Sequence, residues 1–323
     1  MRKLPSSRKS VDDRGFRAGT GFFALIILLL VLGIGFELFR TSHLTIAKFG
    51  LKFWRTSTWD PVAGDFGALP FIWGTLYSSI LALLISTPIA LGIAIFLSEL
   101  SPRGLRTPLT FLTELLAAIP SIVYGLWGVF VLVPVVRKLE VLTPDWLRSV
   151  PLFSGPPLGV GMLSAGLILA VMVIPFSSSV AREVLKAVPA TQREAAYALG
   201  ATRWEAIRAA LFYGRTGILG SIMLGFGRAL GETVAVTMVI GNNPQIRASL
   251  FAPHYTMAAV IANEFTEAAD DLYLSALVEI GLVLFILTVI INAISRLLIW
   301  RTGRMVVSRD TAPIAEPVAG AAA

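Results

Sequence analysis

Long apolar runs recur along this chain of 323 residues, and they constrain its fold more than any other feature. A run of about 18 apolar residues is long enough to cross a bilayer as a helix. Only 15% of the residues are charged, whereas a soluble domain carries about 25%. The sequence therefore predicts an all-α integral membrane protein. Six membrane-spanning helices are expected, over residues 21–39, 69–97, 108–136, 158–180, 216–240 and 274–300.

Charge is distributed unevenly between the segments that join these spans. The N-terminal tail, the segments near 103 and at 182–215, and the segment after 296 hold 18 of the 27 Lys and Arg residues, and the other connecting segments hold 8. Because cytoplasmic loops are enriched in Lys and Arg, this asymmetry predicts that both termini are cytoplasmic. It also explains the net charge of +7 without nucleic-acid binding. The expected regions are a basic tail at 1–19, a transmembrane domain at 20–300 and a disordered tail at 301–323.

Composition excludes several kinds of site. The chain has no cysteine, so it has no disulfide and no cysteine-based metal or redox centre. Its two histidines, His43 and His254, lie far apart near span ends, and no metal site is expected. The chain also has no G-x-x-x-x-G-K-[ST] motif to bind ATP phosphates. We therefore expect no catalytic residue and no bound cofactor, and any ATP-driven step requires a separate ATPase.

Two charged residues fall within the fifth predicted span, which reads G-F-G-R-A-L-G-E-T at 225–233. A charge at the bilayer centre costs roughly 2.5–3.5 kcal/mol on insertion scales, so Arg228 is not expected to face lipid. Spacing of four places Arg228 and Glu232 on one helix face, where they can pair. We interpret them as lining a pathway, where Arg228 attracts an anion and Glu232 keeps its binding weak enough for release. A buried ion pair that fixes helix register is the alternative.

The third predicted span contains A-I-P-S-I-V-Y-G at 118–125. Pro120 removes a helical hydrogen bond, and a broken backbone at membrane depth is tolerated only where protein or a cavity satisfies it. Pro120, Ser121 and Tyr124 are therefore candidates for the pathway lining, and a packing kink is the competing interpretation. Glu114 and Glu279 are weaker candidates, since each can instead face a neighbouring helix.

The polar segment before the fifth span has the pattern of two short helices. Thr191 followed by Glu194 predicts a capping box at the start of the first helix, and Thr202 followed by Glu205 predicts a second. Gly200 lies between them, where a left-handed residue can end a helix. On these caps alone, an ordinary cytoplasmic loop is the plainer interpretation.

The same segment, 191–213, also contains E-A-A-x-x-x-G, formed by Glu194, Ala195, Ala196 and Gly200. This string resembles the signature of ABC importer permeases, in which the segment is the coupling helix that docks in a groove of the ATPase. The resemblance implies that these four residues couple the chain to a separate ATPase. The small alanine side chains agree with this role, because they let a partner surface come close.

Three motifs in order extend the resemblance. They are A-I-P-S-I-V-Y-G-L-W-G at 118–128, E-A-A-Y-A-L-G at 194–200 and G-R-A-L-G-E-T-V-A-V-T-M-V-I-G-N at 227–242. Together they resemble the phosphate ABC transporter permease family of the PstC type, over residues 69–300. The resemblance implies the type I importer fold in a bacterial inner membrane and a role for Arg228 and Glu232 in phosphate passage. It also implies a second homologous permease, two ATPase subunits, an external phosphate-binding protein, and contact with membrane lipid.

Other functions stay open at this stage. A permease for another oxyanion, such as sulfate or molybdate, would share the E-A-A segment. An ion-coupled secondary transporter often has paired broken helices in inverted repeats, and Pro120 and Pro175 lie in consecutive spans, but the two halves show no clear sequence match. A membrane scaffold that reports phosphate status to a signalling partner is a third possibility.

Overall fold

The computed structural model describes residues 9–310, which are helical over most of their length. Five of its helical segments are long and apolar enough to cross a membrane, and a sixth is present if the bent pair α10 and α11 forms one span. The helices are α1 (Lys9–Thr41), α2 (His43–Phe49), α3 (Leu69–Ile95), α4 (Arg103–Ala118), α5 (Ser121–Trp127), α6 (Val133–Leu142), α7 (Asp145–Arg148), α8 (Met162–Ala187), α9 (Ala190–Ala198), α10 (Arg203–Tyr213), α11 (Arg215–Leu230), α12 (Val234–Val239), α13 (Met257–Glu264) and α14 (Asp271–Asp310).

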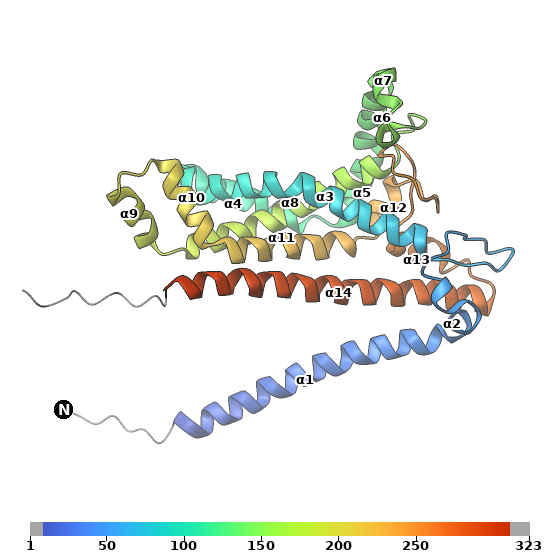
Figure 1. Ribbon diagram of the computed structural model, residues 1–323, viewed down its shortest axis with the longest axis horizontal. Coiled ribbons are helices and arrows are strands. Elements are labelled where there is room, and N and C mark those ends of the chain that lie inside the picture. The colour runs from blue at the N-terminus through green and yellow to red at the C-terminus, as the bar shows by residue number, and fades with distance from the viewer. Residues whose placement is uncertain (1–8, 311–323) are drawn as a thin grey trace, which may run out of the picture.

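The long helices lie roughly side by side (Figure 1). α3 and α8 pack along each other, α11 packs against both, and α14 packs against α11 and carries α1 on its side. α9 and α10 lie at the end of the bundle where α1 begins and α14 ends, and α2 and α13 lie at the opposite end (Figure 1). We refer to these as the coupling end and the outer end. The side of the membrane that each faces stays a prediction of the charge count.

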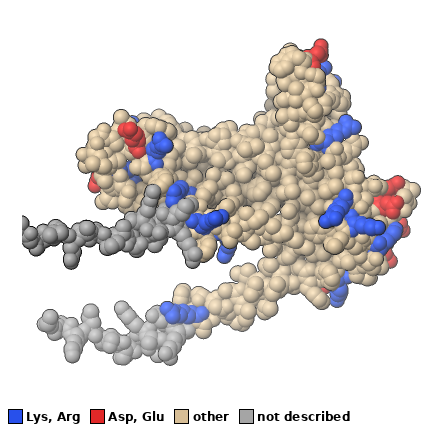
Figure 2. Space-filling model, viewed as in Figure 1, with Lys and Arg blue, Asp and Glu red and all other residues tan. Residues whose placement is uncertain are grey.

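Charged side chains gather toward the two ends, and the viewed face between them is almost free of charge (Figure 2). Such a band suits the hydrocarbon core of a bilayer, and it matches the apolar runs of the sequence. α1 and α14 extend beyond the predicted spans, and residues 9–19 are helical. A helix satisfies its own backbone hydrogen bonds and can therefore continue past the apolar run. The rest of both predicted tails lies at 1–8 and 311–323, outside the described residues.

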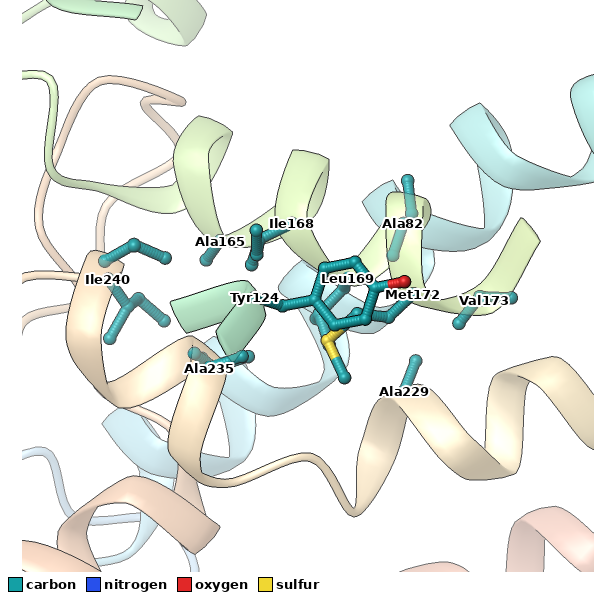
Figure 3. Close-up of a cluster of buried hydrophobic side chains, with 13 residues drawn as sticks. Ala82, Tyr124, Ala165, Ile168, Leu169, Met172, Val173, Ala229, Ala235 and Ile240 are labelled. Carbon is teal, nitrogen blue, oxygen red and sulfur yellow. The ribbon is translucent and has the colours of Figure 1, made fainter. Parts of the chain in front are cut away.

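The inner core brings together α3, α5, α8, α11 and α12. Small and branched side chains of α8 surround the ring of Tyr124 on α5, which is 8% exposed (Figure 3). Five positions of this core carry alanine: Ala82 of α3, Ala165 and Ala170 of α8, Ala229 of α11 and Ala235 of α12. Small residues let membrane helices approach closely, so this alanine lining permits the tight packing of five elements.

A second core lies at the outer end, where the 50–68 loop covers α3, α13 and α14. The ring of Trp59 packs edge-on against Phe66 and Phe71, at centroid distances of 4.9 and 4.8 Å. One carboxylate oxygen of Glu264 accepts hydrogen bonds from the Trp59 indole at 2.8 Å and from the Tyr273 hydroxyl at 2.7 Å. These bonds fix the loop to the bundle, because each polar tip in the aromatic cluster has a partner.

The predicted third span is not one helix. α4 ends at Ala118, and α5 begins at Ser121 after a break at Pro120. Pro120 has no N–H to donate to the carbonyl of Leu116, which instead accepts a hydrogen bond of 2.7 Å from the Tyr124 hydroxyl. The segment long and apolar enough to cross the membrane is therefore 121–142 rather than 108–136. By contrast, α8 continues through Pro175, so only one of the two prolines in consecutive predicted spans breaks its helix.

A matched pair of glycines on α3 tests this packing. An alanine Cβ at Gly74 would lie 2.2 Å from the carbonyl oxygen of Tyr255, whereas one at Gly92 would meet no atom within 4 Å. Gly74→Ala should therefore lower the free energy of unfolding by about 1–3 kcal/mol, since backbone must shift to admit it. Gly92→Ala should leave it unchanged. Thermal unfolding of both variants in detergent measures the difference, and equal melting temperatures would contradict the close approach.

Candidate functional site

The fifth predicted span, 216–240, is broken near its centre. α11 ends at Leu230 and α12 begins at Val234, so Arg228 lies in the last turn of α11 and Glu232 lies in the break. An oxygen of the Glu232 carboxylate accepts from the backbone N–H of Ala235 at 3.4 Å. The carboxylate thus accepts a hydrogen bond from one of the N–H groups at the start of α12 that have no partner within the helix. This bond offsets part of the cost of the break between α11 and α12.

Arg228 and Glu232 line one cavity of about 420 Å³ between α8, α11 and α14. They are the two charged residues in its lining, and two uncharged polar side chains of α14 join them. A cavity of this volume accommodates a small ion with some of its hydration water. The lining residues are Phe176, Met223, Leu224, Gly227, Arg228, Gly231, Glu232, Thr288 and Asn292.

The ion pair of Arg228 and Glu232, which their spacing permits, does not form in this structure. Within residues 9–310 no salt bridge joins them, because the break at Gly231 takes Glu232 off the helical face that spacing alone assigns to it. The guanidinium of Arg228 instead lies over the ring of Phe176, 5.8 Å from its centroid. Its N–H donors therefore remain available to an anion that enters the cavity.

Pro120, Ser121 and Tyr124 do not line this cavity. Pro120 and Ser121 form the start of α5, and the Tyr124 ring is buried in the inner core with its hydroxyl bonded to Leu116 (Figure 3). α5 packs closely on α12, since a Cβ at Gly125 would lie 2.5 Å from the sulfur of Met238. The structure thus places these residues behind the α11–α12 break, where they support it.

A second arginine, Arg182, is buried in the bundle. The sequence analysis did not predict this burial, because it assigned Arg182 to a cytoplasmic segment. Its side chain on α8 is only 8% exposed and reaches α4. It donates to the Thr110 hydroxyl at 2.6 Å and to the Glu114 carboxylate at 3.2 Å, and it lies 2.9 Å from the carboxylate of Glu183. The sequence feature that could have indicated this interaction is Glu114, because a charge within a predicted membrane span requires a partner. Glu279 is buried on α14, and one of its oxygens has no hydrogen-bond partner among the described residues.

The polar segment forms α9 and α10, as two helices separated by a turn. The second predicted capping box is confirmed: the Thr202 hydroxyl accepts from the Glu205 N–H, and the Glu205 carboxylate accepts from the Thr202 N–H. The first is wrong, because α9 begins at Ala190 directly after Pro189, which takes the cap position and leaves Thr191 inside the helix. Proline pre-sets the backbone angle needed there.

Gly200 adopts the predicted left-handed conformation, with φ of +80°. Glu194 and Ala195 on α9 are exposed and Ala196 is half-buried. Leu199 is 90% exposed beside Gly200, an unusual position for a large apolar side chain. α9 lies at the coupling end of the molecule (Figure 1). Its exposed surface therefore combines small side chains with the apolar side chain of Leu199.

Comparison with known proteins assigns the architecture. Residues 88–304 match the model of the family described as "Binding-protein-dependent transport system inner membrane component". The chain belongs to this family. Members are multi-pass inner-membrane transport subunits, in agreement with the apolar helices, and they are not themselves enzymes.

Similar proteins within this family are named phosphate transport system permease protein PstC. The protein from Mesorhizobium japonicum is 47% identical over 92% of this chain and 96% of its own length. That from Pasteurella multocida is 48% identical over 88% and 91%, and the probable PstC of Methanocaldococcus jannaschii is 38% identical over 84% and 88%. The fold is similar to that of a chain of the MetNI methionine ABC transporter, with a TM-score of 0.54 at 17% identity over 72% of this chain and 94% of that one.

The two bundle arginines should differ in their effect on stability. Arg182→Gln should lower the free energy of unfolding by about 1.5–3 kcal/mol, because its buried hydrogen bonds to charged and polar partners are lost. Arg228→Gln should change it little, since Arg228 donates no hydrogen bond within residues 9–310. Thermal unfolding in detergent of the two variants checks this order. A larger loss for Arg228→Gln would mean that its role is structural.

Proposed function

We propose that this chain is a permease subunit of an ATP-driven importer of inorganic phosphate and forms half of its translocation pathway. The likeness to proteins named phosphate transport permeases, over nearly the whole chain, carries the proposal. The Arg228 cavity supplies matching chemistry. A guanidinium presents several N–H donors in a planar fork that suits phosphate oxygens.

Glu232 gives the cavity the second property that transport needs. A carboxylate in the same cavity repels an anion, and it therefore limits how tightly Arg228 can hold one. Conduction requires binding that is favourable enough for entry and weak enough for exit. Arg228 and Glu232 together thus favour transient occupancy over a storage site. Pro120, Ser121 and Tyr124 act indirectly, by packing behind the break that positions Glu232.

ATP hydrolysis acts on this chain through α9. The chain lacks a phosphate-binding loop for ATP, so a separate pair of ATPase subunits hydrolyses it. These subunits dock on Glu194, Ala195, Ala196 and Gly200, and closure of the ATPase pair on nucleotide moves α9. A second, homologous permease completes the pathway within the membrane lipid. A phosphate-loaded binding protein docks at the outer end and delivers the ion.

Replacement of Arg228 tests the pathway. Arg228→Gln should reduce phosphate uptake about tenfold or more, since a charged hydrogen bond contributes about 1.5–3 kcal/mol. Arg228→Lys should give an intermediate rate of phosphate uptake, because lysine keeps the positive charge but lacks the planar fork of N–H donors of a guanidinium. Uptake of labelled phosphate in cells is the measurement, with membrane level and ATPase association monitored. The control is Arg40→Gln, an exposed arginine at the outer end, which should leave uptake unchanged.

The same uptake assay decides the substrate. In cells with and without this gene, phosphate uptake alone should be lost, and excess sulfate or molybdate should not compete. Loss of another oxyanion would retain the architecture and replace the substrate. Persistence of uptake after ATP depletion, with ion gradients clamped, would instead support a secondary transporter.

Gly200 tests the docking of α9. Its left-handed backbone disfavours branched side chains, although nothing lies within 4 Å of a Cβ there. Gly200→Val should therefore change the turn and reduce ATPase recruitment and uptake, whereas Gly200→Asn, which tolerates this conformation, should retain both. Co-purification of the ATPase with each variant measures recruitment. Normal recruitment by Gly200→Val would place the docking surface elsewhere.

A further inference from the structure

Three arginines from three different helices converge on the coupling end of α3. There the chain leaves the α-helix and makes a π-helical turn, η2 (Phe96–Leu100). The carbonyl of Ser98 accepts from Arg106 of α4 at 2.7 Å, and the carbonyl of Glu99 accepts from Arg203 of α10 at 2.7 Å. The Glu99 side chain binds the third, Arg193 of α9.

The pair of Glu99 and Arg193 is bidentate. Nε of Arg193 donates to one carboxylate oxygen at 3.1 Å, and Nη2 donates to the other at 2.5 Å. Two parallel bonds of this kind fix the relative orientation of the two groups as well as their distance. The side chains of Arg193 and Glu99 are 21% and 12% exposed, so the pair is shielded far more than the surface pair of Arg40 and Glu37, which are 70% and 58% exposed.

The same guanidinium also holds the end of α8. Nη1 of Arg193 donates to the carbonyl of Val188 at 3.0 Å, and Nη2 donates to the carbonyl of Leu185 at 2.9 Å. The last carbonyls of a helix have no partner within it, and a cation there also favours the helix dipole. One side chain of α9 therefore joins the ends of α3 and α8, and Arg203 ties α10 to the same turn of α3.

We propose that Glu99 and Arg193 are a positioning pair that transmits the movement of α9 to α3 and α8. This inference rests on the proposed function, since it requires that an ATPase moves α9. Neither residue lines the Arg228 cavity, so the pair acts through other residues and not on the ion. π-helical turns are frequent at functional sites, and here the turn presents the carbonyls that two arginines bind.

The packing supplies the route from this pair to the cavity. α8 packs along the whole of α3 and against α11, and its Phe176 forms part of the cavity wall. A rigid attachment of α9 to the ends of α3 and α8 thus converts movement of the docked helix into movement of the wall. A loose attachment lets α9 follow the ATPase while the bundle stays still.

The test measures phosphate uptake and ATP hydrolysis together, in vesicles that contain the complete importer. Glu99→Gln keeps the shape of the side chain and removes its charge, and Arg193→Lys keeps the charge and removes the fork. Each should lower the phosphate carried per ATP hydrolysed by about fivefold to tenfold, within the usual range of coupling between sites. ATPase association and ATP hydrolysis should remain. Glu37→Gln, which breaks the exposed pair, is the matched control and should transport normally.

Cross-linking separates a mechanical role from a merely structural one. Because the chain has no cysteine, Glu99→Cys with Arg193→Cys introduces two thiols that a short bifunctional maleimide can join, in partners made cysteine-free. The double variant should be uncoupled before the reaction and regain its phosphate-to-ATP ratio after it. The single variants should gain nothing. A complex that stays uncoupled when cross-linked, or Glu99→Gln with a normal ratio, would overturn the inference.

The two proposals fail in distinguishable ways. If the unaltered complex hydrolyses ATP without carrying phosphate, the proposed function is wrong. The positioning role is then decided by the same variants and the same ratio, measured with the oxyanion that the complex carries. If the unaltered complex carries phosphate and the Glu99 and Arg193 variants keep its ratio, the positioning role alone is wrong.

Discussion

Backbone hydrogen bonding inside the bilayer is the constraint on which this structure depends. No water is available there, so each point at which the chain leaves the helix requires a partner from the protein. At Pro120 the Tyr124 hydroxyl donates to the carbonyl of Leu116, which has lost its usual helical donor and also accepts a longer bond of 3.4 Å from the N–H of Ile119. After α11 the Glu232 carboxylate accepts from the N–H of Ala235. At the coupling end, beyond the charge-free band, two arginines likewise donate to backbone carbonyls of η2. The candidate site and the attachment of α9 both occur at such points, because only there does the backbone direct side chains away from regular helical positions.

The break after α11 explains how two charges four residues apart can stay separate. In a continuous helix, Arg228 and Glu232 would neutralise each other and leave little attraction for an anion. The break leaves them in one cavity without a salt bridge between them. Arg182 shows the opposite arrangement, since both terminal nitrogens of its guanidinium donate to protein partners, Thr110 and Glu114. The partners of its guanidinium thus indicate better than its position within a predicted span whether a membrane arginine is free to bind an anion.

The sequence predicted features that depend on local chemistry. Apolar runs predicted the long helices, a Thr and a Glu three residues apart predicted the cap of α10, and a glycine between two helices predicted the left-handed turn. It failed where the outcome depends on which helices are neighbours. The break at Gly231 and the partner of Arg182 each follow from packing against another segment, and one sequence carries no record of that packing. The cap at Pro189 is a local effect of proline that the Thr191 and Glu194 spacing did not take into account. Spacing alone permits a pair of Arg228 and Glu232, and the break keeps the two apart within one cavity.

The burial of α8 explains why the two ends of the molecule can act together. In its most apolar stretch 61% of the residues are buried, a larger share than in the other spans identified in residues 9–310. A closely packed interior is stiff, so a helix held on several sides moves with its neighbours rather than bending alone. Arg193 holds the coupling end of α8, and Phe176 of the same helix contributes to the cavity wall. Pro175 does not break this connection, because α8 remains helical on both sides of it. The sequence thus places its helix breaks on either side of α8 and keeps α8 continuous, which is the arrangement that the proposed transmission of movement from α9 to Arg228 requires.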